Sequence, residues 1–402
     1  MAGFDFTTLG ALLLVASLVA LVTRRINLPY SVGLVAAGIA LALLPFRIPL
    51  PLTPELIFFV FLPPLVFEAA IQIPWRPFRR EASLLLALVT VGVALAALTV
   101  AVGMHFLIGW SWIGAGLFGV LIAATDPVAV IAAFKQLRVD HRLHLLVESE
   151  SLLNDGVAAV GFAILVAIGA GEAAGPMAIG TRLVMTVLGG VAAGAAVALP
   201  LIWLAGRTKD RLVEIMLTMV IAYGSFLLAE HFHASGVLAT LTAGVIVGNF
   251  GFLGSISCDT RQSVLDHWEF VAFFINSLIF ILIGGGVAAV PFVQVVKIAG
   301  IATLLVLVGR AVAVYPVAAL FSRSRLAVPM GYQHVLFWGG LRGALALALA
   351  LGLPVTVPER ETIIVVSFAV VAFSIFVQGI TMPWLIDWLG LIVRDDASPP
   401  RP

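Results

Sequence analysis

The chain has 402 residues, of which 62% are hydrophobic and 11% are charged, and its mean hydropathy is +1.15. A soluble domain carries about 25% charged residues, so a soluble fold of this composition would expose far more apolar surface than its interior could bury. A lipid bilayer is the solvent that fits this composition. The one cysteine, Cys258, excludes an intrachain disulfide framework, and the net charge of +1 indicates no particular partner.

The N-terminal segment predicts a membrane helix that is retained, not a signal that is cleaved. Its first charged residue is Asp5, and no basic residue precedes the apolar run. Arg24 and Arg25 follow the run instead. This order is typical of a first span whose N-terminus lies outside the cell.

Apolar runs long enough to cross a membrane recur along the whole chain. A span needs about 20 apolar residues. Reading the runs between charge clusters predicts thirteen spans, near residues 7–23, 30–46, 54–73, 82–109, 112–135, 143–169, 177–205, 212–231, 235–252, 264–285, 292–321, 329–352 and 361–389.

The basic residues predict the orientation of these spans. If the spans alternate in direction, sixteen of the 22 Lys and Arg residues fall on one side of the membrane, and four on the other. Cytoplasmic loops are the ones enriched in Lys and Arg, so the N-terminus is expected outside and the C-terminus in the cytoplasm. The two remaining basic residues, Arg310 and Arg342, fall in the middle of spans.

Two pairs of segments indicate an internal repeat. The Phe-rich stretch 55–67 resembles 269–281, and the helix break at 124–127 matches another at 340–343. Both pairs are seven spans apart, and because seven is odd, the two copies would have opposite orientations. Inverted repeats are typical of transporters, with the binding site near the bilayer midplane. The alternative is a chance likeness between two Phe-rich helices.

A polar run lies inside the sixth predicted span. Asp155 follows Arg142 by thirteen residues, about 20 Å along a helix, which places it near mid-depth. Ser151 shares its face, and Glu150 and Asn154 form a second pair on the adjacent face. An ionisable residue at this depth is a functional candidate by default. The alternative is a solvated helix end.

Two spans contain signals for a helix break. In the fifth span, Thr125 is followed by Asp126 and Pro127, and Asp before Pro is a strong helix-start signal. A half-helix is therefore expected to begin here, with Asp126 at its positive end. The alternative is a kinked span with a locally satisfied Asp126. In the twelfth span, glycines flank Arg342, which could neutralise exposed carbonyl ends.

Other charged residues within the spans need partners or routes. A buried Arg310 requires a carboxylate, and Glu150 is the expected partner in a structural ion pair. Glu68 could join the ion path or could be an acid at the membrane interface. The roles of three further residues stay open: Glu148, His141 and His144.

The buried oxygen donors suit a hard monovalent cation. Asp155 can hold a proton or a cation but not both, so competition at one carboxylate would produce exchange and pH dependence together. The sequence contains no P-loop and no zinc-peptidase or nucleophile-elbow motif. We therefore expect neither an enzyme nor an ATP-driven pump, and no cofactor.

Together, these motifs resemble the monovalent cation/proton antiporter superfamily, in the branch of prokaryotic NhaP-like exchangers and animal sodium/proton exchangers. The resemblance covers most of the chain in order. Its Asn-Asp and Gly-Gly-Leu-Arg-Gly signatures are the most specific. The stretches that carry it are 61–68 ending in Glu68, 124–127, 150–156, Gly309-Arg310 and 339–344.

The resemblance implies an all-α polytopic membrane protein of about thirteen helices, with two inverted six-helix repeats and crossed, broken helices near 126 and 342. It implies a homodimer in a bacterial or archaeal inner membrane, in contact with lipids, monovalent cations and protons but not with nucleic acid. The dimerisation scaffold would comprise 1–76 and 206–290, and a mobile, elevator-like core 77–170 and 291–394. A linking helix at 171–205 and a short cytoplasmic tail at 395–402 complete the expected organisation.

The resemblance also implies roles for residues. Asp155 would carry the ion and the proton, and Na⁺ would be bound by Asp155, Ser151 and Thr125, the last through its carbonyl. Asp126 would balance the helix ends, and Glu150 would pair with Arg310. In this superfamily, Asn before the carrier aspartate accompanies electroneutral exchange, and Asn154 occupies that position. The expected activity is exchange of Na⁺ or Li⁺ for H⁺ in pH homeostasis; the alternatives are a K⁺/H⁺ antiporter of the same fold or a cation channel.

Overall fold

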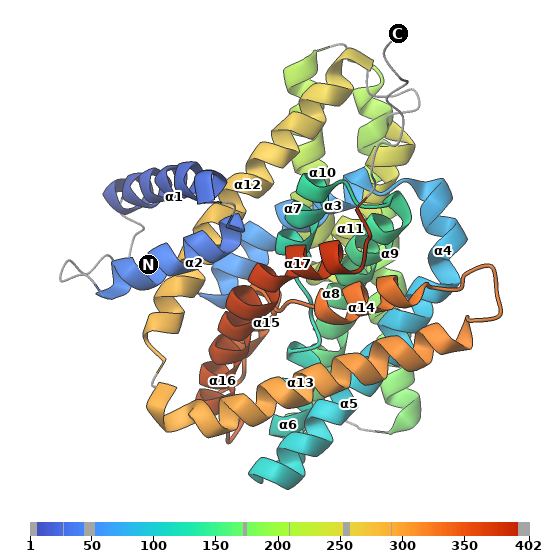
Figure 1. Ribbon diagram of the computed structural model, residues 1–402. Helices are drawn as coiled ribbons and strands as arrows, with labels where there is room; N and C mark the ends of the chain where they lie inside the picture. The colour runs from blue at the N-terminus through green and yellow to red at the C-terminus, as the bar shows by residue number, and fades with distance from the viewer. Residues whose placement is uncertain are drawn as a thin grey trace.

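A computed structural model describes residues 6–26, 28–43, 53–171, 175–208, 210–251, 258–290 and 292–392. Every named element in these ranges is a helix (Figure 1). Within the described residues, eight helices are long and apolar enough to cross a membrane, and shorter or interrupted apolar helices make up the other five predicted spans. The expected all-α polytopic fold, with breaks near 126 and 342, is confirmed. The expected tail at 395–402 lies outside the described residues.

The first six spans run from α1 to α8. Two of them contain π-helical turns, η1 in the third span and η2 and η3 in the fourth. Their bounds are α1 Phe6–Ile26, α2 Tyr30–Leu43, η1 Leu56–Phe61 with α3 Leu62–Gln72, α4 Trp75–Ala87, η2 Leu88–Gly92, α5 Val93–Gly103, η3 Met104–Ile108, α6 Trp112–Leu121 with α7 Val128–Leu137, and α8 His141–Gly169.

The seventh span, α9, separates these from six further spans. The twelfth span is interrupted between α14 and α15, and the last contains the π-helical turn η5. The bounds are α9 Pro176–Ala205, α10 Arg211–His231, α11 Gly236–Asn249, α12 Cys258–Ala288, α13 Phe292–Leu320, α14 Met330–Trp338, α15 Ala344–Leu351, α16 Arg360–Phe373, η5 Ser374–Gly379 and α17 Ile380–Trp388.

The helices pack in two groups. In one, α2 lies along α12, and α11 lies along α3, α9 and α10. In the other, α13 and α6 lie along α5, α14 and α16 pack against α13, and α15 packs against α6 and α16. Gly38 and Gly284 permit the close approach of α2 and α12, because a Cβ on Gly38 would lie 2.1 Å from the Ile281 carbonyl oxygen. In Figure 1, α1 lies at the edge of the molecule and α13 crosses it beside α5.

Two of these contacts match the seven-span offset in the sequence. The second span packs on the tenth, as α2 on α12, and the ninth packs on the third, as α11 on α3. If the second span corresponds to the ninth and the third to the tenth, the two contacts are copies of each other.

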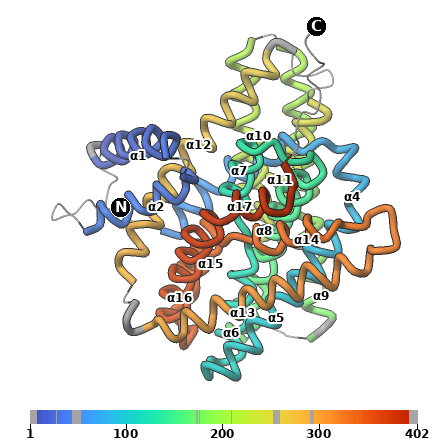
Figure 2. Tube along the Cα trace, viewed as in Figure 1, coloured from blue at the N-terminus to red at the C-terminus, as the bar shows by residue number. Residues whose placement is uncertain are grey.

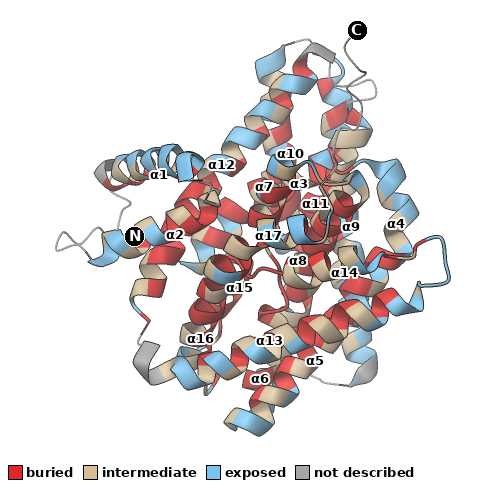
Figure 3. Cartoon of the chain, viewed as in Figure 1, coloured by how far each residue is buried: buried red, intermediate tan, exposed pale blue. Residues whose placement is uncertain are grey.

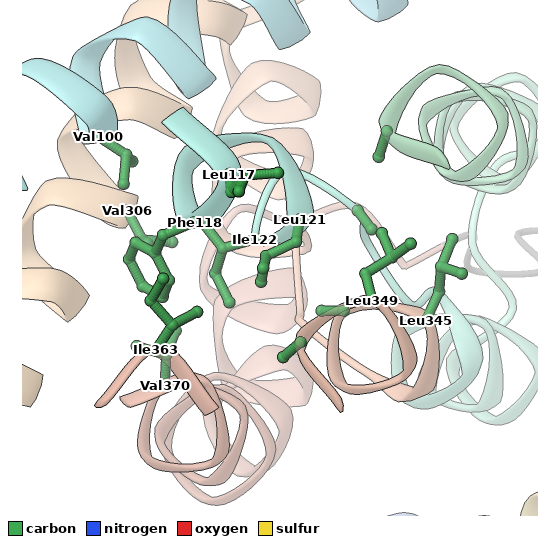
Figure 4. Close-up of a cluster of buried hydrophobic side chains, with 14 of the residues drawn as sticks. Val100, Leu117, Phe118, Leu121, Ile122, Val306, Leu345, Leu349, Ile363 and Val370 are labelled. Carbon is green, nitrogen blue, oxygen red and sulfur yellow. The ribbon is translucent and has the colours of Figure 1, made fainter. Parts of the chain in front are cut away.

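Apolar side chains pack together one half-helix of each interrupted span, α6 and α15. Phe118 and Leu121 of α6 and Leu349 of α15 are buried in one cluster, with Val306 of α13 and Ile363 of α16 (Figure 4). Within a bilayer, close packing and not exclusion of water favours such contacts. The packed half-helices α6 and α15 flank the non-helical segments of the two interrupted spans.

Exposed apolar side chains cover the outside of the molecule, as a bilayer requires. Leu14 and Leu21 of α1 are 62% and 65% exposed, and Met185 of α9 is 69% exposed. Figure 3 shows the exposed outer helices around a buried centre. The buried polar residues described below lie in that centre.

Candidate functional site

The two interrupted spans cross at their non-helical segments, between α6 and α7 and between α14 and α15. The Asp126 amide donates a hydrogen bond to the Leu341 carbonyl oxygen at 2.8 Å. A Cβ added to Gly343 would lie 2.1 Å from Oδ2 of Asp126, so the crossing requires glycine there. In Figure 2 the chain segments of α7, α8, α14 and α15 come together in the middle of the molecule.

Opposite charges lie at the helix ends of the crossing. Oδ1 of Asp126 accepts a hydrogen bond from the Val128 amide at 3.0 Å, at the positive end of α7. The Arg342 guanidinium donates to the carbonyl oxygens of Ala123 and Ala124, at 3.0 and 3.2 Å, just beyond the end of α6. These groups satisfy backbone atoms that have no partner within their own helices.

Asp155 lies beside the first break, on α8. The Thr125 amide donates to Oδ1 of Asp155 at 3.3 Å. The Ser151 hydroxyl donates to the Thr125 carbonyl at 2.7 Å, and its oxygen lies 3.0 Å from the Thr125 hydroxyl. The structure thus brings Asp155, Ser151 and Thr125 together, with carboxylate, hydroxyl and carbonyl oxygens at one place.

A buried ion pair supports this cluster. Arg310 donates to both oxygens of Glu150, at 2.5 and 2.8 Å, and to the Leu336 carbonyl at 3.1 and 2.8 Å. Such a two-pronged contact is strong and directional. Asn154 Nδ2 lies 2.6 Å from Oε1 of Glu150 and 3.3 Å from the Thr125 hydroxyl. Asn154 therefore connects the ion pair to the oxygens around Asp155.

A cavity of about 310 Å³ leads to Asp155 and Asp126. One wall comes from α2, α3 and α12, and the other from α7, α8 and α15. Glu68 lies on the α3 side, where Gln72 donates a hydrogen bond to it. Glu68 and Glu148 are close enough to interact electrostatically. Glu68 and Asp155 therefore line the same cavity.

The described residues contain no group of three or more His, Cys, Asp or Glu side chains that could hold a metal ion. The crossing instead brings the Asp155 carboxylate close to the hydroxyl and carbonyl oxygens of Ser151 and Thr125, a type of oxygen set that suits a hard cation.

Comparison with known proteins gives the family. The model of the transmembrane sodium/hydrogen exchanger family matches residues 11–388. The chain belongs to this family. Among its relatives, the Na⁺/H⁺ antiporter ApNhaP of Aphanothece halophytica is 38% identical over 368 residues, which cover 91% of this chain and 70% of the relative. The Na⁺/H⁺ antiporter NhaS2 of Synechocystis is 36% identical over 383 residues, which cover 94% of this chain and 70% of that relative.

A solved structure shows the same fold. The sodium proton antiporter MjNhaP1 from Methanocaldococcus jannaschii superimposes with a TM-score of 0.77 at 18% identity, covering 96% of this chain and 98% of that one. The sodium/hydrogen exchangers are transporters, not enzymes, and the family predicted from the motifs is confirmed. The chain is a multi-pass membrane protein of this bacterial and archaeal antiporter family.

Several polar contacts of this chain were not predicted from its sequence. Lys135 of α7 pairs with Glu269 of α12 at 3.8 Å across the two walls of the cavity. His144 Nε2 lies 3.6 Å from Glu148. Ser374 and Gln378 of η5 bond the interrupted twelfth span. The sequence signal for Ser374 and Gln378 was that they are polar residues within the apolar stretch 361–389.

Proposed function

We propose that the protein exchanges Na⁺ or Li⁺ for H⁺ across the inner membrane, with Asp155 binding the cation and the proton in turn. The observation that carries the proposal is the position of Asp155, which lines the cavity and lies close to the oxygens of Thr125 and Ser151. The names of the curated relatives support Na⁺ as the cation.

Exchange follows from competition at this one carboxylate. Water exclusion disfavours the charged form of a buried carboxyl, whereas a bound cation favours it. A proton must therefore leave Asp155 before Na⁺ can bind with full strength, and Na⁺ must leave before the proton returns. Neither Asp126, which bonds Val128, nor Glu150, which bonds Arg310, has its carboxylate as free for this role.

The charges at the crossing support one-for-one exchange. The crossing contains three carboxylates and two guanidinium groups. Glu150 pairs with Arg310, and the positive charge of Arg342 offsets the negative charge of Asp126 in the total. Asp155 is the acid left over, and Asn154 beside it is neutral. One Na⁺ or one H⁺ at Asp155 brings the cluster to the same total charge, so the exchange is electroneutral.

Alternating access would come from movement of a core, residues 77–170 and 291–394, against a scaffold, residues 1–76 and 206–290. The cavity lies along the boundary between these two groups of helices, and Asp155 belongs to the core. The equivalent contacts of α2 with α12 and α11 with α3 support two inverted repeats, from which two related access states can arise. The helix at 171–205 would link the two halves.

The orientation inferred from the basic residues makes the cavity cytoplasmic. Lys135, which lines it, lies in the last turn of α7, and Arg138 in the following loop and Arg142 at the start of α8 lie on the same side, which is rich in basic residues. The N-terminus would then be outside and the C-terminus in the cytoplasm. The exposed apolar faces of α1 and α9 would contact lipid and a second copy of the chain in a homodimer.

Reconstituted protein tests the choice of ion and the type of transporter. Proteoliposomes with an imposed pH gradient and a ΔpH dye receive Na⁺, Li⁺ or K⁺, with Asp155→Asn protein as the control. Collapse of the gradient by Na⁺ and Li⁺, absent in the variant, supports the proposal. Collapse by K⁺ alone would make the protein a K⁺/H⁺ antiporter. A steady cation current without coupled H⁺ movement would make it a channel.

A further inference from the structure

Two buried polar side chains of the last span point at the interrupted twelfth span. Ser374 and Gln378 are 1% and 4% exposed and both belong to the π-helical turn η5. Such turns inside α-helices occur frequently at functional sites. Neither side chain contributes to the cavity or to the cation-binding oxygens, so they need another explanation.

The Ser374 hydroxyl lies within hydrogen-bond distance of both backbone groups of Arg342, the amide and the carbonyl oxygen. Its hydroxyl oxygen accepts a hydrogen bond from the Arg342 amide at 3.1 Å. The same hydroxyl lies 3.2 Å from the Arg342 carbonyl oxygen and 2.9 Å from that of Val371, to one of which it donates. Arg342 lies between two helices, where its own backbone groups have no helical partner.

Gln378 holds the end of the preceding half-helix. Its Nε2 donates to the carbonyl oxygen of Trp338, the last residue of α14, at 3.1 Å. Arg310 bonds the Leu336 carbonyl, and the Asp126 amide bonds that of Leu341. Groups from other spans thus hold the unwound segment at several points along its length.

Arg342 connects Ser374 to the residues proposed to bind the cation. Arg342, whose backbone Ser374 fixes, places its guanidinium on the carbonyls of Ala123 and Ala124. The next residue, Thr125, bonds Asp155 through its amide and Ser151 through its carbonyl. A shift of Arg342 would therefore move the oxygens around the cation.

We propose that Ser374 and Gln378 are positioning residues for cation exchange. They fix the segment at 339–343 and, through Arg342, keep Thr125 in register with Asp155. This inference rests on the proposed exchange of cations at Asp155. Ser374 and Gln378 themselves touch neither the cation nor the proton; they act only through the backbone of the crossing.

Ser374→Ala tests the proposal, and the same span offers a matched control. Ser367 of α16 is 0% exposed and donates only to Ile363 of its own helix, at 2.7 Å. In proteoliposomes, Ser374→Ala is expected to raise the KM for Na⁺ about tenfold, in line with loss of a buried hydrogen bond. Ser367→Ala is expected to leave this KM unchanged. Gln378→Met should raise it as well, and Ser374→Thr, which keeps the hydroxyl, should restore it.

Amide hydrogen exchange gives a readout that does not depend on transport. The peptide that covers 339–343 should exchange faster in Ser374→Ala than in Ser367→Ala, while peptides of α10 and α11 stay as in the wild type. An unchanged KM, an equal rise in both alanine variants, or unchanged exchange at 339–343 would overturn the positioning role. Wild-type protein without Na⁺/H⁺ exchange would refute the proposed function instead, and the amide exchange would still show whether Ser374 holds the crossing.

Discussion

Asn154 lies between two partners: its Nδ2 is 2.6 Å from Oε1 of Glu150 and 3.3 Å from the hydroxyl of Thr125. Glu150 is in turn bound by Arg310. The Asn154 amide therefore ties a fixed ion pair to Thr125, whose backbone amide donates a hydrogen bond to Asp155. This arrangement separates the paired charges of Glu150 and Arg310 from the Asp155 charge that we propose changes during exchange.

The Glu150–Arg310 pair is expected to be structural. Removing Arg310 alone leaves a buried carboxylate uncompensated, so Arg310→Ala should destabilise the protein by about 3–5 kcal/mol. Neutralising both partners, with Glu150→Gln and Arg310→Gln together, should recover much of that stability and retain Na⁺-dependent exchange. Thermal unfolding in detergent and transport in proteoliposomes measure the two effects. A stable double variant that transports nothing at any Na⁺ concentration would show that the pair takes part in exchange.

The crossing of the broken helices should not tolerate a side chain at Gly343. The Cβ of Gly343→Ala would lie 2.1 Å from Oδ2 of Asp126, so either the segment or the carboxylate must move. We expect transport to fall by at least tenfold, since each 1.4 kcal/mol of strain corresponds to a factor of ten. The control is Gly300→Ala on α13, where a Cβ meets nothing within 4 Å. Equal transport by both variants would contradict the described crossing.

The proposed movement of the core against the scaffold can be tested with a cross-link between positions 135 and 269. The side chains of Lys135 and Glu269 lie 3.8 Å apart, on α7 and α12 respectively. In a Cys258→Ser background, Lys135→Cys with Glu269→Cys and a short reducible cross-linker should stop transport, and reduction should restore it. Arg142 and Glu81, 2.8 Å apart and both within the core, supply the control pair. Transport that continues through a complete 135–269 cross-link would exclude this movement.

Competition at one carboxylate predicts a specific pH dependence. Where Asp155 is mainly protonated, each further unit of acidification should raise the apparent KM for Na⁺ by about tenfold, because the proton concentration rises by that factor. The maximal rate at saturating Na⁺ should change little over the same range. Initial rates over a grid of pH and Na⁺ concentration measure both quantities. A maximal rate that falls at constant KM would instead indicate a separate pH sensor.

Local sequence signals predicted where the important residues would lie, but not all of their partners. Asp126 before Pro127 and the glycines around Arg342 marked both breaks, because helix-start and helix-breaking residues act locally. A charge at mid-membrane must be paired, so a carboxylate partner was expected for Arg310 and Glu150 was predicted to be that partner. The structure places these two side chains in contact.

Partners that depend on how helices rotate and tilt could not be predicted. The choice of Ala123 and Ala124 as acceptors for Arg342 depends on the path of the unwound segment. Lys135 and Glu269 meet only because α7 and α12 face the same cavity. Ser374 is one hydroxyl in an apolar helix, and nothing in its sequence surroundings indicates which neighbour it bonds.

The central claim is that Asp155 exchanges a proton for a cation, and proton release on cation binding tests it most directly. Purified protein in weakly buffered detergent solution, with a pH indicator, is titrated with NaCl, and choline chloride serves as the control for ionic strength. At a pH where Asp155 is protonated, wild-type protein should release about one proton per Na⁺ bound, following one-site competition, and Asp155→Asn protein should release none. Na⁺ binding without proton release by the wild type, or undiminished release by the folded Asp155→Asn variant, would contradict the account.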